Sequence, residues 1–186
     1  MMRYLKHFEN ADDVVRACEL ENFFNAINED NCAEVKRMLR IIPELINIRN
    51  LSNKTPIMNA NSAKMLQILL DHGANPEAQD DDGWKFIHFT STTGNVELLK
   101  TLLLHGVDVN SKTKTGFTAL MGTAVFMNFE SMKLLLSFGA KYYIRDAEGK
   151  TFYDWADRGA EKRGIEIRKW IEENYKSLVT SKKFGL

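Results

Sequence analysis

The chain has 186 residues, of which 44% are hydrophobic and 27% are charged, a balance typical of a soluble folded protein rather than a disordered or fibrous one. Its 25 basic and 25 acidic residues cancel, so no net field favours nucleic acid or an anionic membrane surface. Apolar runs such as residues 102–104 are far shorter than the roughly 20 residues of a membrane-spanning helix. Two cysteines, Cys18 and Cys32, do not make a disulfide framework or a zinc site, and they favour a reducing, cytoplasmic compartment.

A period of 33 residues runs through most of the chain. Glycines at 73, 106 and 139 follow leucine-rich stretches, and Lys85, Thr118 and Thr151 come twelve residues after them. Each of these three residues is preceded, two positions earlier, by another glycine, at 83, 116 and 149. Thr55 and Asn22 place two earlier units with a weaker signature. Fixed spacings of this kind predict stacked repeats of one supersecondary unit.

In chain order, we expect a capping segment at 1–21, a repeat domain at 22–178 and a frayed tail at 179–186. The predicted units are 22–50, 51–80, 81–113, 114–146 and 147–178, each read as turn, short helix, turn and longer helix. In the third unit, Gly94 ends the short helix because glycine readily adopts the left-handed conformation. Apolar residues from Val96 to Leu103 then recur at helical spacing. Helices this short are marginal alone, so each unit must pack on its neighbours.

The segments that open the units resemble the Thr-Pro-Leu-His-x-Ala motif of ankyrin repeats. They read Thr-Pro-Ile-Met-Asn-Ala at 55–60, Lys-Phe-Ile-His-Phe-Thr at 85–90, Thr-Ala-Leu-Met-Gly-Thr at 118–123 and Thr-Phe-Tyr-Asp-Trp-Ala at 151–156. The resemblance covers residues 22 to about 178. It implies an all-α ankyrin-repeat solenoid of about five helix-turn-helix units with short β-hairpin-like loops. It also implies that the ring of His88 bonds to backbone between adjacent repeats.

Two units depart from the pattern. Only 30 residues separate Thr55 from Lys85, which places a three-residue deletion after Ala60 and predicts a shorter first helix or turn with a local change of curvature. The last unit needs about three extra residues at 160–163 to bring its apolar residues into the core. Those residues are Ile167, Trp170 and Ile171, and the charged outer face of this terminal cap is Glu166, Arg168, Lys169, Glu172 and Glu173.

Catalytic and metal-binding interpretations fit the residues poorly. Gly149-Lys150-Thr151 lacks the earlier glycine of a phosphate-binding loop, since Ile144 stands there. The acidic run at 80–83 lacks the closing glutamate of a calcium loop. Cys18 and Cys32 are read as small core residues, and an unconventional site within 1–21 stays the enzymatic alternative. We therefore predict no enzyme activity, no cofactor and no metal.

The exposed hairpins and the first helices, which form the concave face in ankyrin proteins, are where a partner is expected to bind. Trp84 and Phe117 occupy corresponding positions in adjacent units, so stacking should place their rings side by side. Phe89 and Trp155 are read as core. The alternative is that neighbouring hairpins and helices already cover the exposed rings. The predicted site consists of Trp84, Phe117, Phe126, Asp81, Asp82, Lys54, Lys114 and Lys150.

These observations predict a non-enzymatic module that binds another protein, as an adaptor, an inhibitor or an immunity or effector-type regulator. We expect a cytoplasmic monomer that binds neither nucleic acid nor membrane. Two alternatives stay open: a structural subunit that self-associates through the same aromatic residues, and a regulatory subunit of an enzyme complex.

Overall fold

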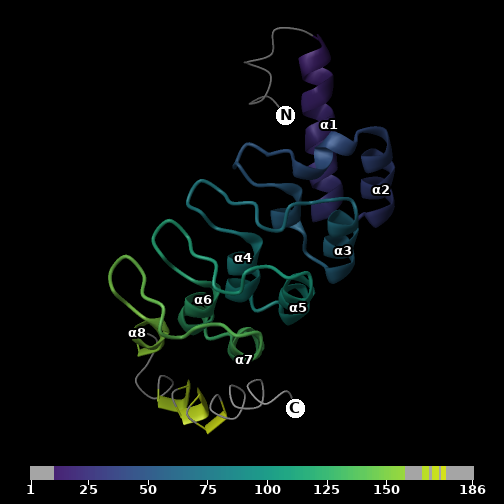
Figure 1. Ribbon diagram of the computed structural model, residues 1–186. Coiled ribbons are helices and arrows are strands. Elements are labelled where there is room, and N and C mark those ends of the chain that lie inside the picture. The colour runs from purple at the N-terminus through teal and green to yellow at the C-terminus, as the bar shows by residue number, and fades with distance from the viewer. Residues whose placement is uncertain (1–10, 158–164, 168, 172, 175–186) are drawn as a thin grey trace. The chain divides into compact units, whose positions relative to one another are not determined.

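The structure, a computed structural model, describes residues 11–157, 165–167, 169–171 and 173–174 (Figure 1). The chain divides into two compact units, residues 1–80 and 81–186. Apart from an isolated antiparallel bridge between Lys112 and Thr118, the regular structure of the described residues is helical. The arrangement matches the expected succession of paired short helices joined by loops.

The first compact unit contains three α-helices and two 3-10 turns in its described part. They are α1 (Ala11–Asn28), α2 (Cys32–Ile41), η2 (Pro43–Asn47), η3 (Pro56–Asn59) and α3 (Ala63–Asp71). α1 packs on α2 and η3, and α2 packs on α3. The fully buried side chains include Phe23, Ile27, Met65, Leu66 and Leu69.

The expected capping segment and the first repeat share one helix, because α1 runs without a break from Ala11 to Asn28. The side chains of Val14 and Val15, which belong to the expected capping segment at 1–21, lie outside the described residues. The prediction that Cys18 and Cys32 are buried is wrong: Cys18 is exposed and Cys32 half-buried. The buried face of α2 consists instead of Val35, Met38 and Leu39.

The deletion after Ala60 shortens the second repeat as predicted. Its first helix is reduced to η3, four residues in 3-10 conformation, whereas the corresponding helices of the next two repeats have eight residues each. Asn61 and Ser62 then follow directly, and the Ser62 hydroxyl accepts the N–H of Met65 (3.0 Å) to begin α3. The change of curvature at this repeat stays a prediction.

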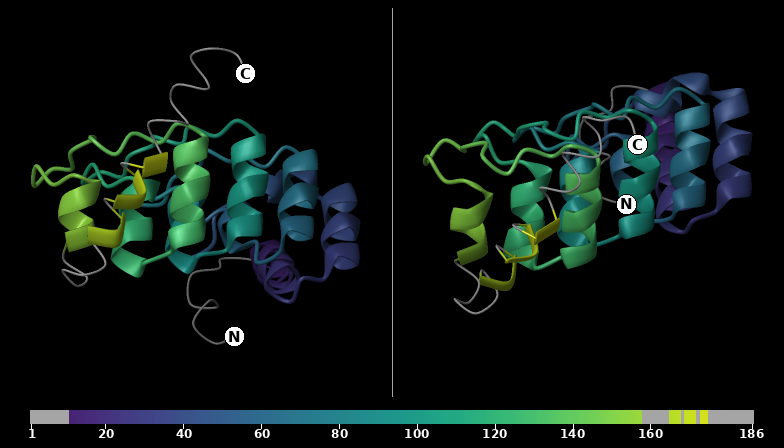
Figure 2. Two further views of the ribbon diagram at one scale, coloured as in Figure 1. Left: turned by 90° about the horizontal axis from the view of Figure 1, so that it is seen from below. Right: turned by 60° about the horizontal axis from the view of Figure 1, so that its bottom comes forward.

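The second compact unit has two layers of helices, which can be followed in both views of Figure 2. One layer is α4 (Phe86–Thr93), α6 (Ala119–Phe126) and α8 (Phe152–Asp157), in which α6 contacts both neighbours. The other layer contains α5 (Val96–Leu104) and α7 (Phe129–Ser137), which pack on each other and on the first layer. Fully buried leucines, among them Leu99, Leu102, Leu120 and Leu135, fill the space between the layers.

Residues 165–167, 169–171 and 173–174 are also helical. Ile167 and Ile171 are buried there, as predicted, and Trp170 is half-buried against Phe129 with ring centroids 5.6 Å apart. The described residues of the expected outer face, Glu166, Lys169 and Glu173, are exposed. Arg168, Glu172, the insertion at 160–163 and the tail at 179–186 lie outside the described residues.

Side-chain hydrogen bonds join separate elements of the second compact unit. Gly94 ends α4 in the left-handed conformation (φ 72°), as predicted, and the Asn128 amide donates to the carbonyls of Ser91 and Thr92 (2.8 and 2.7 Å). The Nδ1 atom of His88 accepts the N–H of Lys85, and its Nε2–H donates to the carbonyl of Ser111, both at 3.1 Å.

The ring of His88 bonds to backbone, as the resemblance implies, but both partners, Lys85 and Ser111, lie in the same predicted repeat, 81–113, and not in an adjacent one. A backbone N–H can only donate and a carbonyl can only accept, so these two bonds fix a neutral imidazole that carries its proton on Nε2. Burial lowers the pKa of His88, although its backbone hydrogen bonds oppose that shift. His88 thus has a structural role, because it joins the start of α4 to the loop that follows α5.

Candidate partner-binding site

The hairpins of the second unit are positioned by glycines in the left-handed conformation. Gly83 and Gly116 have φ values of 79° and 77°, and each ends a turn immediately before an aromatic residue. A Cβ at Gly116 would lie 3.0 Å from the Asp146 Cα, and one at Gly83 would lie 2.8 Å from the Lys114 nitrogen. Only glycine combines this backbone conformation with so close an approach of the next hairpin.

Backbone hydrogen bonds hold neighbouring hairpins together. The Lys114 N–H donates to the Asp82 carbonyl (3.0 Å), and the Ala147 N–H donates to the Thr115 carbonyl (2.8 Å). These bonds keep the three hairpins in register, so the residues that follow the three glycines occupy equivalent positions in adjacent repeats. In the described unit those residues are Trp84, Phe117 and Lys150.

Four aromatic rings follow one another across three repeats, and we call Phe89, Trp84, Phe117 and Trp155 the aromatic row. Trp84 and Phe117 lie side by side with centroids 5.9 Å apart and planes tilted by 31°. Phe89 contacts Trp84 at 5.3 Å, and Trp155 meets Phe117 edge-on at 5.4 Å and 88°. All four side chains are half-buried.

The interpretation of Phe89 and Trp155 as core residues is wrong, because both are half-buried members of this row. A regularity in the sequence could have revealed them. Phe89 and Trp155 stand five positions after Trp84 and Lys150, and the same position of the middle repeat is Gly122. A Cβ at Gly122 would lie 3.0 Å from the Thr92 methyl and 3.6 Å from the Phe117 ring, so this glycine makes room for Phe117.

A pocket of about 270 Å³ opens beside the row. One Asp146 oxygen accepts the Trp155 indole N–H (2.8 Å), and the other accepts the backbone N–H groups of Glu148 and Lys150 (2.9 and 2.8 Å). The Lys150 ammonium lies 5.3 Å from the centre of the Trp155 ring and pairs with Glu148. The pocket is lined by Trp84, Thr115, Phe117, Asp146, Ala147, Glu148 and Trp155.

Comparison with known families agrees with this geometry. The family model described as ankyrin repeats (3 copies) matches residues 23–113, 57–146 and 87–166, which together span more than half of the chain. The chain belongs to the ankyrin-repeat family. A search of curated proteins found no match. Ankyrin repeats are generally protein–protein interaction modules without enzymatic activity, and the all-α ankyrin-repeat fold predicted from the sequence is confirmed.

The other predicted site residues of this ankyrin protein occupy three places. Asp81, Asp82 and Lys114 are exposed on the hairpins that carry Trp84 and Phe117. Lys54 is half-buried and belongs to the first compact unit. Phe126 is 57% exposed at the C-terminal end of α6, together with the exposed Val125 and Met127. Because a helix rises about 1.5 Å per residue, Phe126 lies roughly 10 Å along α6 from the hairpins.

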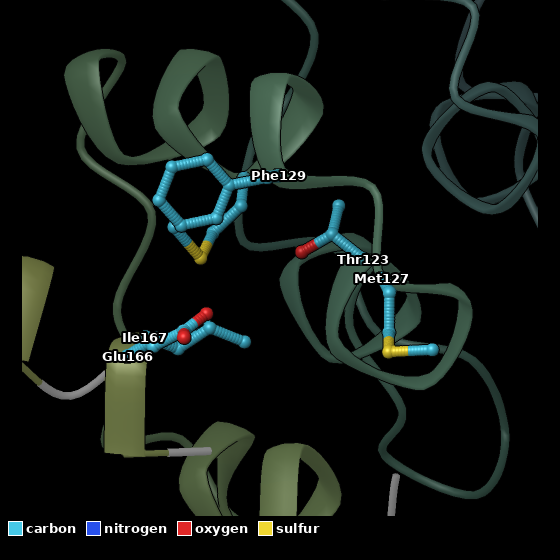
Figure 3. Close-up of a pocket in the computed structure, with 6 residues that line it drawn as sticks. Thr123, Met127, Phe129, Glu166 and Ile167 are labelled. Atoms are coloured by element: carbon cyan, nitrogen blue, oxygen red, sulfur yellow. The ribbon is translucent and has the colours of Figure 1, made fainter. Parts of the chain in front are cut away.

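A second pocket of about 300 Å³, shown in Figure 3, was not foreseen from the sequence. Met127, one of its lining residues, turns the chain at the end of α6 with a φ of 56°, which is uncommon outside glycine. No periodic signal distinguishes this site, since its walls come from α6, α7 and the residues around 166. It is lined by Thr123, Met127, Phe129, Met132, Glu166 and Ile167.

Neither pocket has the residues of a metal site. Among the described residues, no three His, Cys, Asp or Glu side chains gather in a way that could hold a metal ion. Within the same residues, no helix has the length and apolar character needed to cross a membrane. The aromatic row and its pocket offer ring faces, carboxylates and backbone groups, which can pack against a partner and form hydrogen bonds with it.

Proposed function

We propose that this ankyrin-repeat protein is a non-enzymatic module that binds a protein partner through the aromatic row and the pocket beside it. The observation that carries the proposal is the continuity of the aromatic row across three repeats, with every ring only half-buried. Large rings with surface left to bury contribute most of the binding energy at protein interfaces.

The surroundings of the row fit an interface with a polar rim. Asp81, Asp82 and Lys114 are exposed next to the two central rings, so charges of both signs surround an apolar centre. Phe126 adds a second apolar contact farther along α6. Lys150, held by Glu148 and Trp155, belongs to the same surface, and Lys54 stays a predicted rim residue of the other unit.

Capture of partners from native lysate tests the site. The test variant is Trp84→Ala with Phe117→Ala, and the matched control is Leu104→Ala with Tyr143→Ala, two exposed apolar residues outside the row. If each central ring contributes about 2 kcal/mol, the double variant loses at least a hundredfold in affinity, whereas the control keeps it. Circular dichroism and thermal unfolding verify that both variants fold. Equal recovery of the same partner by both variants removes the assignment of the row as the site.

Self-association is the second candidate, because Val125, Phe126 and Met127 form an exposed apolar group at the end of α6. We propose a monomer, for which light scattering gives one mass over a hundredfold range of concentration. A mass that rises with concentration, and that Phe126→Ser restores to the monomer value, favours the self-associating subunit.

If the captured partner is an enzyme, its activity with and without the protein separates an inhibitor or regulatory subunit from an adaptor.

A further inference from the structure

The pocket beside the aromatic row combines two features, aromatic rings and carboxylates, that both attract cations. Three of its lining residues, Trp84, Phe117 and Trp155, provide ring surface, and two others, Asp146 and Glu148, provide carboxylates. No basic residue is among the lining residues of the described chain. Ring faces attract cations through their quadrupole, and carboxylates attract them through charge.

The chain's own Lys150 already uses this chemistry at the edge of the pocket. Its ammonium is 5.3 Å from the centre of the Trp155 ring and is paired with Glu148. The Lys150 side chain is 23% exposed, and that of Glu148 is 66% exposed, so the pair lies at the surface, where ion pairs are weak. A second cation can therefore compete with Lys150 for the same ring and carboxylate.

The occupant that fits best is a guanidinium group. Guanidinium is planar, stacks on aromatic faces, bonds carboxylates with two parallel donors and is less strongly hydrated than an ammonium. An apolar side chain would fit this lining less well, because it offers Asp146 and Glu148 neither a hydrogen-bond donor nor a positive charge. Trp84 and Phe117 are already in contact at 5.9 Å, so the guanidinium would lie against Trp155 and not between those two rings.

We propose that the pocket binds an arginine side chain of the partner, which displaces the Lys150 ammonium from Trp155 and Glu148. This inference rests on the proposed function and specifies the partner: the segment lying on the aromatic row carries an arginine. Asp146 holds the pocket open for it, because its oxygens tie the Trp155 indole to the hairpin backbone. The Glu148 carboxylate then pairs with the guanidinium of the arginine in place of the Lys150 ammonium.

Side-chain indole N–H signals in NMR spectra of the full chain test the pocket directly. The probe is N-acetyl-arginine methylamide, and the matched neutral probe is N-acetyl-citrulline methylamide, which has nearly the same shape without the charge. Trp170 serves as internal reference, because its ring lies against Phe129 and does not line the pocket. We expect the arginine probe to shift the Trp84 and Trp155 signals with a dissociation constant on the order of millimolar, and the citrulline probe to shift neither.

Two variants are expected to change the affinity for the arginine probe in opposite directions, which a merely structural role of these residues does not predict. Glu148→Gln should weaken the arginine probe at least threefold. Lys150→Met should strengthen it, because the internal competitor is gone, whereas a Lys150 that only supports the fold would weaken binding when removed. Lys133→Met is the matched control: Lys133 lies 4.5 Å from the centre of the Phe129 ring and pairs with Glu130, outside the pocket.

Equal shifts with both probes, or no shift with the arginine probe at about 50 mM, overturn the arginine assignment. Its failure is distinguishable from failure of the proposed function. Partner capture that depends on Trp84 and Phe117 but is unchanged by Glu148→Gln leaves the function standing and removes the arginine. Specific arginine shifts, together with partner capture that ignores Trp84 and Phe117, keep the pocket and remove the proposed face.

Discussion

Alanine at Gly116 tests how the hairpins are stacked beneath the aromatic row. Gly116 has a φ of 77°, and a Cβ there would lie 3.0 Å from the Asp146 Cα and 3.2 Å from the Ala147 nitrogen. Gly149 is a matched control, because it has the same φ of 77° with nothing within 4 Å of its Cβ position. The two substitutions therefore share the conformational cost and differ only in the contact with the next hairpin.

The expected magnitudes follow from these two costs. An L-residue in the left-handed conformation costs roughly 1–2 kcal/mol, and this applies to both variants. At Gly116 the new methyl also meets backbone that cannot rotate away, and overpacking of this kind costs about 1–3 kcal/mol more. Since both changes restrict the unfolded chain equally, the difference between Gly116→Ala and Gly149→Ala isolates the stacking contact.

Urea unfolding followed by circular dichroism measures both free energies, and tryptophan fluorescence reports on the rings of the row. We expect Gly116→Ala to unfold at a clearly lower urea concentration than Gly149→Ala. Asn53 occupies the equivalent position in the first compact unit with a φ of 54°, so the left-handed conformation by itself does not require glycine. Equal destabilisation of the two variants would refute the claim that close approach of hairpins requires glycine at 116.

Two further predictions concern the hydrogen-bonded side chains of His88 and Asn128. Burial lowers the pKa of His88. Its imidazole therefore takes up a proton near pH 6.5 in the unfolded chain, whereas in the folded chain it is still neutral at that pH. The free energy of unfolding should therefore fall as the pH drops below about 6.5, by at most about 1.4 kcal/mol per pH unit from this group. Urea unfolding over a pH series should show that His88→Gln removes this part of the slope and that the exposed His105→Gln keeps it; an unchanged slope in His88→Gln contradicts the assignment. Asn128→Ala removes two hydrogen bonds to the end of α4 and should cost about 1–3 kcal/mol, and an unaltered thermal midpoint would count against that link.

The periodicity of the sequence determined the type of fold because each repeat is too small to be stable alone. Glycines recur every 33 residues, and apolar residues between them recur at helical spacing. Stacking of helix pairs buries the apolar faces that this spacing creates. The same register placed Trp84 and Phe117 at equivalent hairpin positions. It also located the shortened repeat, since a missing turn of helix changes the spacing between Thr55 and Lys85.

The tertiary structure decided which rings stay accessible and which charges meet them. The motif predicts that Phe89 and Trp155 are core residues, but both are half-buried. The repeat between them has Gly122 at the same position, and the Phe117 ring occupies the space that a side chain there would need. The pairing of Lys150 with Glu148 over Trp155 likewise depends on distances across a hairpin and a helix. Repeat spacing specifies the position of each Cα in its unit, whereas exposure and ion pairing depend on side-chain directions across neighbouring repeats, which a linear pattern does not contain.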